Sequence, residues 1–193
     1  MNNESADILR ILTNAFDHLL PPAQREANKG PSALIPSHLR VEIDELNAWV
    51  FDTVNNGVYK IGFAVSQSAY DEHITKLFRS LDRLEDHLSQ PGHSPYLFGQ
   101  YITEADIRLY TTLVRFDVAY HTLFKCNVKM IRMDYPLLHT WLRRLYWNEG
   151  PETAGGAFKK STDFDVVSMY FPEKRLNELN VVDQKRVCIC DNR

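Results

Sequence analysis

The 193-residue sequence has little of several features that mark special classes of protein. It holds only three cysteines, Cys126, Cys188 and Cys190, too few for a disulfide framework, so a reducing compartment is expected, by default the cytoplasm. No apolar run approaches the roughly 18 residues of a membrane span. The first residues, M-N-N-E-S-A-D, lack the basic and apolar regions of a signal peptide. We therefore expect no membrane partner.

An excess of charge of one sign is also missing. Lysine and arginine number 22 and aspartate and glutamate 25, which gives a net charge of −3 and no electrostatic footprint for nucleic acid. The sequence contains no H-E-x-x-H, G-x-G-x-x-G, phosphate-loop or G-x-S-x-G motif. Cys188 and Cys190 form a C-x-C pair, which cannot complete a four-ligand zinc site, and the seven histidines show no ligand spacing. No metal is expected.

What the sequence has in quantity is helical periodicity. Residues 4–20 read as a helix that Pro21 and Pro22 end, and residues 21–36 read as a proline-rich linker. A second helix is expected from Ser37, with Asn56-Gly57 as its C-cap and G-V-Y-K-I-G-F-A as a loop. The clearest amphipathic helix starts at Ser66 and stops at Pro91-Gly92.

Further helices are expected after Asp134 and from Asp163 to Tyr170, and the chain becomes polar from Pro172. No strand-like alternation interrupts these segments. The predicted class is all-α, a helical bundle.

The segment from Tyr96 to Asn127 holds the predicted centre of that bundle. Thr103 and Asp106 have the spacing of a capping box, and the helix that follows is apolar on most faces, which is typical of a buried helix. Its charged residues, Arg108, Arg115 and Asp117, are expected to form an Arg–Asp bridge, because buried charges must be paired. Cys126 is expected to be a small buried hydrophobe; the alternative is a thiol activated by its lysine neighbour.

T-E-A-D-I-R-L resembles the capping box in the helical domain of glutathione transferases. R-F-D-V-A-Y-H-T-L-F-K-C-N, G-V-Y-K, Q-S-A-Y-D-E, L-F-R-S-L-D-R-L-E and D-Y-P-L-L-H-T-W-L-R-R-L-Y-W-N resemble the glutathionyl-hydroquinone reductases, or Xi class. The resemblance implies a glutathione S-transferase C-terminal helical bundle over residues 37–171. Residues 1–20 would then be the last helix of a largely absent thioredoxin-like domain, 21–36 the linker and 172–193 a polar tail.

The same resemblance implies roles for individual residues. Tyr59, Tyr120 and Tyr170 would line a hydroquinone pocket, since a neutral phenol offers a flat apolar wall and one hydrogen-bond donor. The match is weaker at Tyr170, and ordinary packing is the alternative for each tyrosine. Glu4 and Ser5 would hold the γ-glutamyl part of glutathione; alternatively, Ser5 only caps the first helix.

The implied activity is reduction of glutathionyl-hydroquinones with glutathione as co-substrate. A cysteine thiolate attacks the glutathionyl sulfur, the hydroquinone leaves, and a second glutathione releases oxidised glutathione. That cysteine would belong to a Cys-Pro motif upstream of Met1, so no catalytic residue is expected in this chain. A homodimer through the helical domain is implied too. The alternative is a catalytically inactive module that binds ligands or protein partners.

Overall fold

The structure, a computed structural model, describes residues 4–169, which form helices joined by turns and loops without a β-strand in that range. The longer helices are α1 (Ser5–Ala15), α2 (Arg40–Val50), α4 (Gln67–Ser89), α5 (Glu104–Arg115) and α8 (Pro136–Trp147). The shorter ones are α3 (Gly57–Gly62), α6 (His121–Leu123), α7 (Ile131–Asp134), α9 (Ala157–Lys160) and α10 (Phe164–Met169). The predicted all-α class is confirmed for the described residues. Within them, no helix combines the length and apolarity that crossing a bilayer requires.

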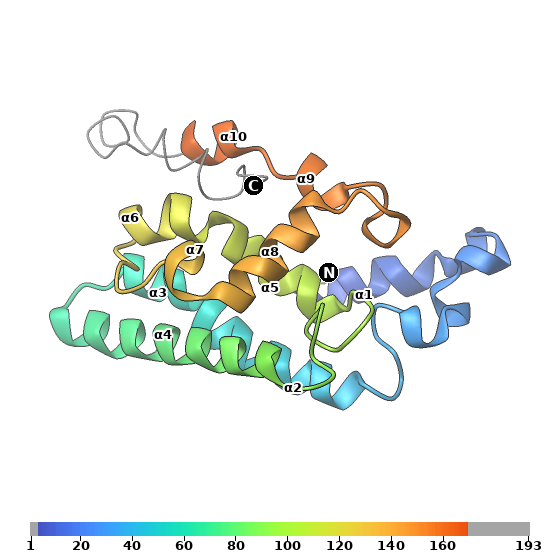
Figure 1. Cartoon of the computed structure of the whole chain (residues 1–193), viewed down its shortest axis with the longest axis horizontal. Helices are drawn as coiled ribbons and strands as arrows, with labels where there is room; N and C mark the ends of the chain where they lie inside the picture. Colours follow the sequence, from blue (N-terminus) through green and yellow to red (C-terminus); the bar gives the residue numbers. More distant parts are fainter. Residues whose placement is uncertain (1–3, 170–193) are drawn as a thin grey trace.

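Helix α5 runs through the middle of the bundle, with α4 on one side and α9 and α10 on the other (Figure 1). Its neighbours α2 and α8 pack against it, and α8 also packs against α4. The core is one continuous cluster of buried side chains contributed by these helices. Packing against these helices holds α5 in place. Glu104 and Asp106 lie in its first turn and Arg115 in its last turn.

Helix α4 forms where the sequence predicts it. The Ser66 hydroxyl accepts the Ala69 N–H at 3.2 Å, which satisfies one of the unpaired donors of the first turn. Leu77, Leu81 and Leu84 repeat at helical spacing and are completely buried against the bundle. Hydrophobic burial of this stripe holds the helix in place.

The segment between α2 and α4 differs from the prediction. The helical conformation does not end at Asn56-Gly57, because a π-helical turn (Phe51–Asn55) connects α2 directly with α3. The expected G-V-Y-K loop is therefore helical. Gly57 is buried in that helix, where a Cβ would lie 3.8 Å from the Asp52 carbonyl oxygen. Both this contact and the next one, 4.0 Å to Leu77 Cδ1, are ordinary van der Waals distances, so Gly57 is a buried helix position that neither ends the helix nor requires glycine for packing.

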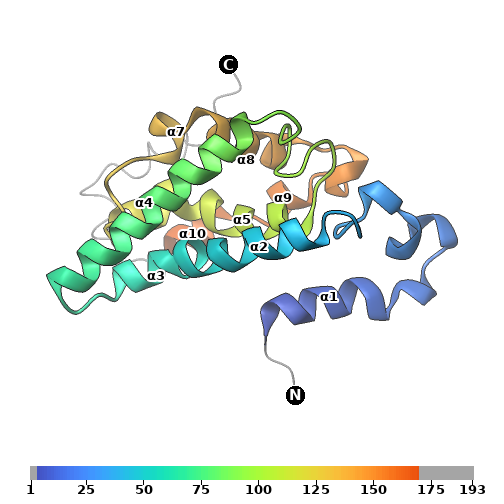
Figure 2. The same cartoon turned by 90° about the horizontal axis from the view of Figure 1, so that it is seen from below.

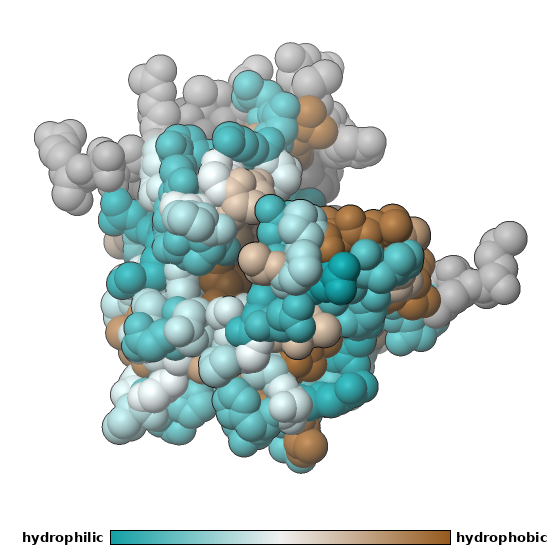
Figure 3. All heavy atoms as spheres, turned by 90° about the vertical axis from the view of Figure 1, so that its right-hand side faces the viewer, coloured by the Kyte–Doolittle hydropathy of each residue, from teal (hydrophilic) through white to brown (hydrophobic). Residues whose placement is uncertain are grey.

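Helix α1 stands apart from the bundle (Figure 2). After it, four short 3₁₀ turns carry the chain through residues 17–32 to α2. The apolar side chains of α1 and the turn that follows are largely exposed: Ile8, Ile11, Leu12, Phe16, Leu19 and Leu20. Figure 3 shows hydrophobic residues exposed in patches on one face of the molecule. An amphipathic helix with an uncovered apolar face is unusual in an isolated domain.

Candidate functional site

Two of the predicted tyrosines meet. Tyr59 lies on α3 and Tyr120 at the end of a π-helical turn (Phe116–Tyr120) that continues α5, 61 residues further along the chain. Their hydroxyl oxygens are 2.9 Å apart and share a hydrogen bond. Their rings meet edge to face, with centroids 5.6 Å apart. The helical form of G-V-Y-K brings Tyr59 to this position.

Phenylalanines complete an aromatic cluster around the pair. The Phe124 ring lies 5.4 Å from the ring centroids of both tyrosines, and Phe63 lies 5.6 Å from Phe124. A Cβ at Gly62 would come within 2.6 Å of the Phe124 ring, so only glycine leaves room for this contact. Tyr120 is buried, at 4% exposure, whereas Tyr59 is 40% exposed. The cluster therefore has one phenol inside the protein and one at its surface.

Burial raises the pKa of Tyr120 to about 12, and its hydrogen bond with Tyr59 acts in the same direction. The Arg115 guanidinium, at the end of α5, hydrogen-bonds to Tyr120 and acts in the opposite direction. Tyr120 is therefore neutral at pH 7 and keeps its O–H as a donor. A neutral donor beside a fixed cation can stabilise negative charge on a bound oxygen.

The other predicted ligand residues lie elsewhere. Glu4 precedes the first turn of α1 and is exposed, and Ser5 is the first residue of that helix. The structure places neither of them in the aromatic cluster, which is built from α3 and the segment after α5. Tyr170, Cys188 and Cys190 lie outside the described residues.

A chain of charges joins α1 to the bundle. Arg10 donates from Nε to Glu104 at 2.8 Å and from Nη2 to Asp44 at 2.6 Å. Glu104 is buried at the start of α5 and also pairs with Arg108 at 3.3 Å. Arg108 therefore pairs with a glutamate of its own helix, not with the expected aspartate.

Asp117 has a role that the predicted Arg–Asp bridge did not include. Its two carboxylate oxygens accept the backbone N–H groups of Ile131 and Arg132 at 2.8 and 3.0 Å. These are orphan donors at the start of α7, where the helix dipole favours a negative charge. Asp117 thus anchors the segment that follows Tyr120. Sequence reasoning missed this contact, because no local pattern connects Asp117 with a short helix that starts 14 residues later.

The predicted capping box is present at the start of α5. One Asp106 oxygen accepts the backbone N–H and the hydroxyl of Thr103, both at 2.8 Å. The other accepts the Leu97 N–H at 3.0 Å and the Trp141 indole N–H at 2.9 Å. Burial raises the pKa of Asp106, while the four donors favour its ionised form. This carboxylate ties α5 to α8 and to the loop before it, and so fixes the position of Tyr120 indirectly.

Cys126 is buried, and burial raises the pKa of its thiol to about 12. It is therefore a thiol, not a thiolate, near neutral pH, and it is a poor nucleophile. Across residues 4–169 no group of three or more His, Cys, Asp or Glu side chains is arranged to hold a metal ion.

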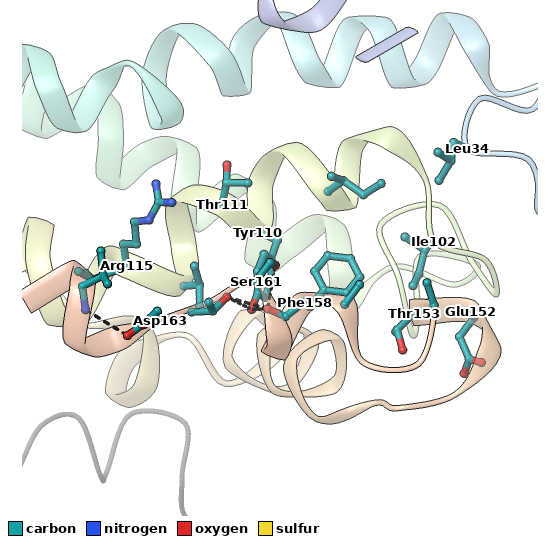
Figure 4. A pocket seen from close by; sticks show the side chains of 17 residues that line it. Leu34, Ile102, Tyr110, Thr111, Arg115, Glu152, Thr153, Phe158, Ser161 and Asp163 are labelled. Atoms are coloured by element: carbon teal, nitrogen blue, oxygen red, sulfur yellow. Dashed lines mark hydrogen bonds between the residues drawn. The ribbon is translucent and has the colours of Figure 1, made fainter. Parts of the chain in front are cut away.

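A cavity of about 550 Å³ lies between α5 and the α9–α10 segment (Figure 4). Its walls come from four stretches that are distant in sequence: Leu34, Ile102 to Arg115, Glu152 to Asp163, and α10. Neither Tyr59 nor Tyr120 lines it; Arg115 belongs to both sites. No sequence pattern indicates this cavity, because its lining residues come together only in the folded bundle.

A capped central helix within an all-α bundle is the fold that the resemblance implied for a glutathione S-transferase helical domain. Residues 67–144 match the family model described as glutathione S-transferase, C-terminal domain. The chain therefore contains a C-terminal domain of the glutathione S-transferase family.

Relatives narrow the comparison to the Xi and omega-like classes. The chain is 51% identical over 184 residues to glutathionyl-hydroquinone reductase YqjG of Escherichia coli. This match covers 94% of the chain and 50% of the E. coli protein. It is 43% identical over 183 residues to glutathione S-transferase omega-like 2 of Schizosaccharomyces pombe, covering 94% and 55%. The chain thus spans about half the length of these curated relatives.

A solved structure also indicates similarity to the Xi class. The Xi glutathione transferase ECM4 of Saccharomyces cerevisiae, in complex with glutathione, superposes with a TM-score of 0.76 at 38% identity. The match covers 92% of this chain and 55% of that one. The resemblance to the Xi class that the sequence motifs indicate is confirmed.

Proposed function

We propose that this chain forms the helical, substrate-binding part of a glutathione S-transferase-like enzyme that reduces glutathionyl-hydroquinones with glutathione. The observation that carries the proposal is the contact between the Tyr59 and Tyr120 hydroxyls within an aromatic cluster. The similarity to the reductase of E. coli supports it.

In this proposal a hydroquinone ring lies against the aromatic cluster. The two phenols give up their mutual hydrogen bond, and the hydroquinone oxygens accept hydrogen bonds from both. When a thiolate attacks the glutathionyl sulfur, the C–S bonding electrons pass to the ring and its oxygens, and the ring carbon then takes up a proton. The neutral phenols and the Arg115 charge stabilise the negative charge at that moment. Tyr170 would be the third phenol of this pocket.

Glutathione would be held at the start of α1, by Glu4, Ser5 and the backbone N–H groups of the first turn. The exposed apolar face of α1 supports this assignment, because such a face fits the last helix of a thioredoxin-like domain that packs on its sheet. The proposed division is accordingly residues 1–20 for that helix, 21–36 for the linker, 37–171 for the helical domain and 172–193 for the tail. Pairing of two helical domains in a homodimer belongs to the same proposal.

A second candidate is a binding module without catalysis. The buried thiol of Cys126 favours it, since this residue cannot act as the nucleophile in its ground-state form. Turnover of glutathionyl-menadiol with glutathione separates the two candidates. Turnover that Cys126→Ser abolishes would contradict the structural role of this cysteine.

Calorimetric titration of the chain with menadiol under anaerobic conditions tests the pocket itself. Tyr59→Phe and Tyr120→Phe each remove one hydroxyl and should weaken binding by roughly three- to tenfold, as for the loss of one hydrogen bond. Tyr101→Phe is the matched control, because Tyr101 is 50% exposed and lies in the loop before α5. If both site variants bind menadiol as the unchanged chain does, the pocket is assigned wrongly.

A further inference from the structure

Each tyrosine of the aromatic cluster is preceded by a π-helical turn. The turn Phe51–Asn55 leads into α3, which carries Tyr59, and the turn Phe116–Tyr120 ends on Tyr120 itself. A π-helical turn adds one residue to a helix and so changes the direction in which the following side chains point. The meeting of the two hydroxyls therefore depends on how these turns are held relative to each other.

Asn55, the last residue of the first π-helical turn, connects this turn to α5. Its Nδ2 donates to the Arg108 carbonyl oxygen at 3.0 Å and to Thr112 Oγ1 at 2.7 Å. The Arg108 carbonyl can only accept, so the amide nitrogen must face α5, and both of its N–H groups are used. Thr112 is buried, and a hydrogen bond shielded from water is stronger than one at the surface. Asn55 thus joins the two segments that carry the tyrosines.

The spacing along each segment relates this contact to the tyrosines. Tyr59 lies one helical turn after Asn55, which places both side chains on the same side of that segment. Tyr120 lies two turns after Thr112, counting the additional residue of the π-helical turn. A regular α-helix would have brought Ala119 to that side instead. The contact between Asn55 and Thr112 therefore sets the register in which Tyr59 meets Tyr120.

Helix α4 holds the same π-helical turn from another side. The Ser80 hydroxyl donates to Thr53 Oγ1 at 2.7 Å, and the Thr53 hydroxyl donates to the Trp49 carbonyl at 2.7 Å. Both this contact and that of Asn55 stabilise the turn, but the Asn55 contact is the one that reaches the helix leading to Tyr120. The pair of Ser80 and Thr53 therefore provides a matched control for general loosening of the turn.

We propose that Asn55 is a positioning residue for the reduction of glutathionyl-hydroquinones. Its amide holds α3 against α5 in the register that brings the Tyr59 hydroxyl to the Tyr120 hydroxyl, and it acts on the substrate only through Tyr59. This inference rests on the proposed function. Removal of the amide donors should separate the two hydroxyls while both phenols remain in the chain.

NMR spectra of the full chain with isotope-labelled tyrosine Cζ atoms test the positioning directly. Tyr59→Phe and Tyr120→Phe identify the two signals. Asn55→Asp keeps the shape of the side chain but has no N–H donor, so both signals should shift. Ser80→Ala removes the hydrogen bond to α4 and should leave both signals in place. Unshifted signals in Asn55→Asp, or equal shifts in Asn55→Asp and Ser80→Ala, would overturn the proposal.

Thr112→Val tests the same contact from the α5 side. The substitution keeps the shape of the side chain and removes the acceptor at Oγ1, while the Arg108 carbonyl still accepts from Asn55. The two tyrosine signals should therefore shift in the same direction as in Asn55→Asp, but less. If circular dichroism shows that Asn55→Asp does not fold, Thr112→Val decides the question, and unshifted signals in this variant would contradict the proposal.

Calorimetric titration with menadiol separates positioning from a purely structural role. Asn55→Asp should weaken binding roughly three- to tenfold, as Tyr59→Phe does, because it withdraws the same hydroxyl. The double variant should bind no more weakly than Tyr59→Phe alone, since no hydroxyl then remains to be positioned. Additive losses would overturn the proposal. A Tyr59→Phe chain that binds menadiol normally would instead contradict the proposed function, so the two failures are distinguishable.

Discussion

Helices α1 and α4 have the same kind of sequence and opposite surroundings. Both carry apolar side chains at helical spacing, yet Leu81 and Leu84 of α4 are completely buried, whereas Ile11 and Leu12 of α1 are 48% and 58% exposed. Apolar burial holds α4 in the bundle, while the Arg10 ion pairs with Asp44 and Glu104 are the charged contacts that join α1 to it. Periodicity thus predicts that a helix has an apolar face, but not which surface covers that face.

The largest expected effect comes from comparing the same substitution, Leu→Ala, in the buried helix α4 and in the exposed helix α1. Leu84→Ala should lower the free energy of unfolding by about 3–5 kcal/mol, because it leaves a cavity in a closed core. Leu12→Ala removes the same atoms from an exposed position and should cost less than about 0.5 kcal/mol. Urea denaturation followed by circular dichroism measures both values. Comparable losses for the two variants would mean that the α1 face is covered in solution.

The second-largest expected loss of stability comes from a buried polar residue of the bundle, Asp106. Asp106→Asn places an amide N–H₂ against a set of donors that need acceptors, and should cost roughly 2–3 kcal/mol. The Trp141 indole loses its acceptor at the same time, so the near-ultraviolet dichroism of this residue should change. Glu72→Gln, in an exposed pair with Lys76, is the control and should change stability by less than about 0.5 kcal/mol. An unchanged Trp141 signal would argue against the four-donor geometry.

The attachment of α1 is tested by Glu104→Gln. The variant keeps the volume of the side chain but removes the charge that Arg10 and Arg108 share, and should cost roughly 1–2 kcal/mol. Hydrogen exchange of the α1 amides should accelerate more than exchange in α4, because the Glu104 ion pairs reach Arg10 on α1 and Arg108 on α5 but no residue of α4. Equal acceleration in both helices would show that α1 and the bundle unfold together.

How far the sequence predicted the molecule depends on the range of each interaction. The α4 helix and the Thr103–Asp106 box were predictable, since their signals lie within a few residues of each other. The helical G-V-Y-K segment was not, because Gly57 and Gly62 read locally as loop residues. Gly62 leaves room for Phe124, which is far away in sequence, and Gly57 is a buried position within α3.

The candidate site divides in the same way. Family motifs pointed to Tyr59 and Tyr120, and the fold brings their hydroxyls together. Arg115 was expected in an Arg–Asp bridge, and its contact with Tyr120 depends on the π-helical turn between them, which no local pattern indicated. The cavity beside α5 needed four separate stretches and was missed entirely.

The smallest predicted effect is a pH dependence that belongs to the bundle and not to α1. The rings of His87 and His93 lie 4.0 Å apart, and both donate to the Leu97 carbonyl, at 2.7 and 2.8 Å. Burial lowers the pKa of His87, and the neighbouring charges of His93 and Arg83 lower it further. His87 therefore holds the loop before α5 while its ring is neutral.

Because the pKa of His87 in the folded state lies below its ordinary value of about 6.5, the unfolded state binds more protons at mildly acidic pH. Stability should therefore be fully present above about pH 6.5 and fall as the pH drops, by less than about 1.4 kcal/mol per pH unit, the ceiling for one proton. Urea denaturation at several pH values between 7.5 and 5.5 measures this slope, which His87→Gln should reduce. Hydrogen exchange should accelerate in residues 91–103 before it does in α1, and the reverse order would show that the acid-sensitive contact lies outside the bundle.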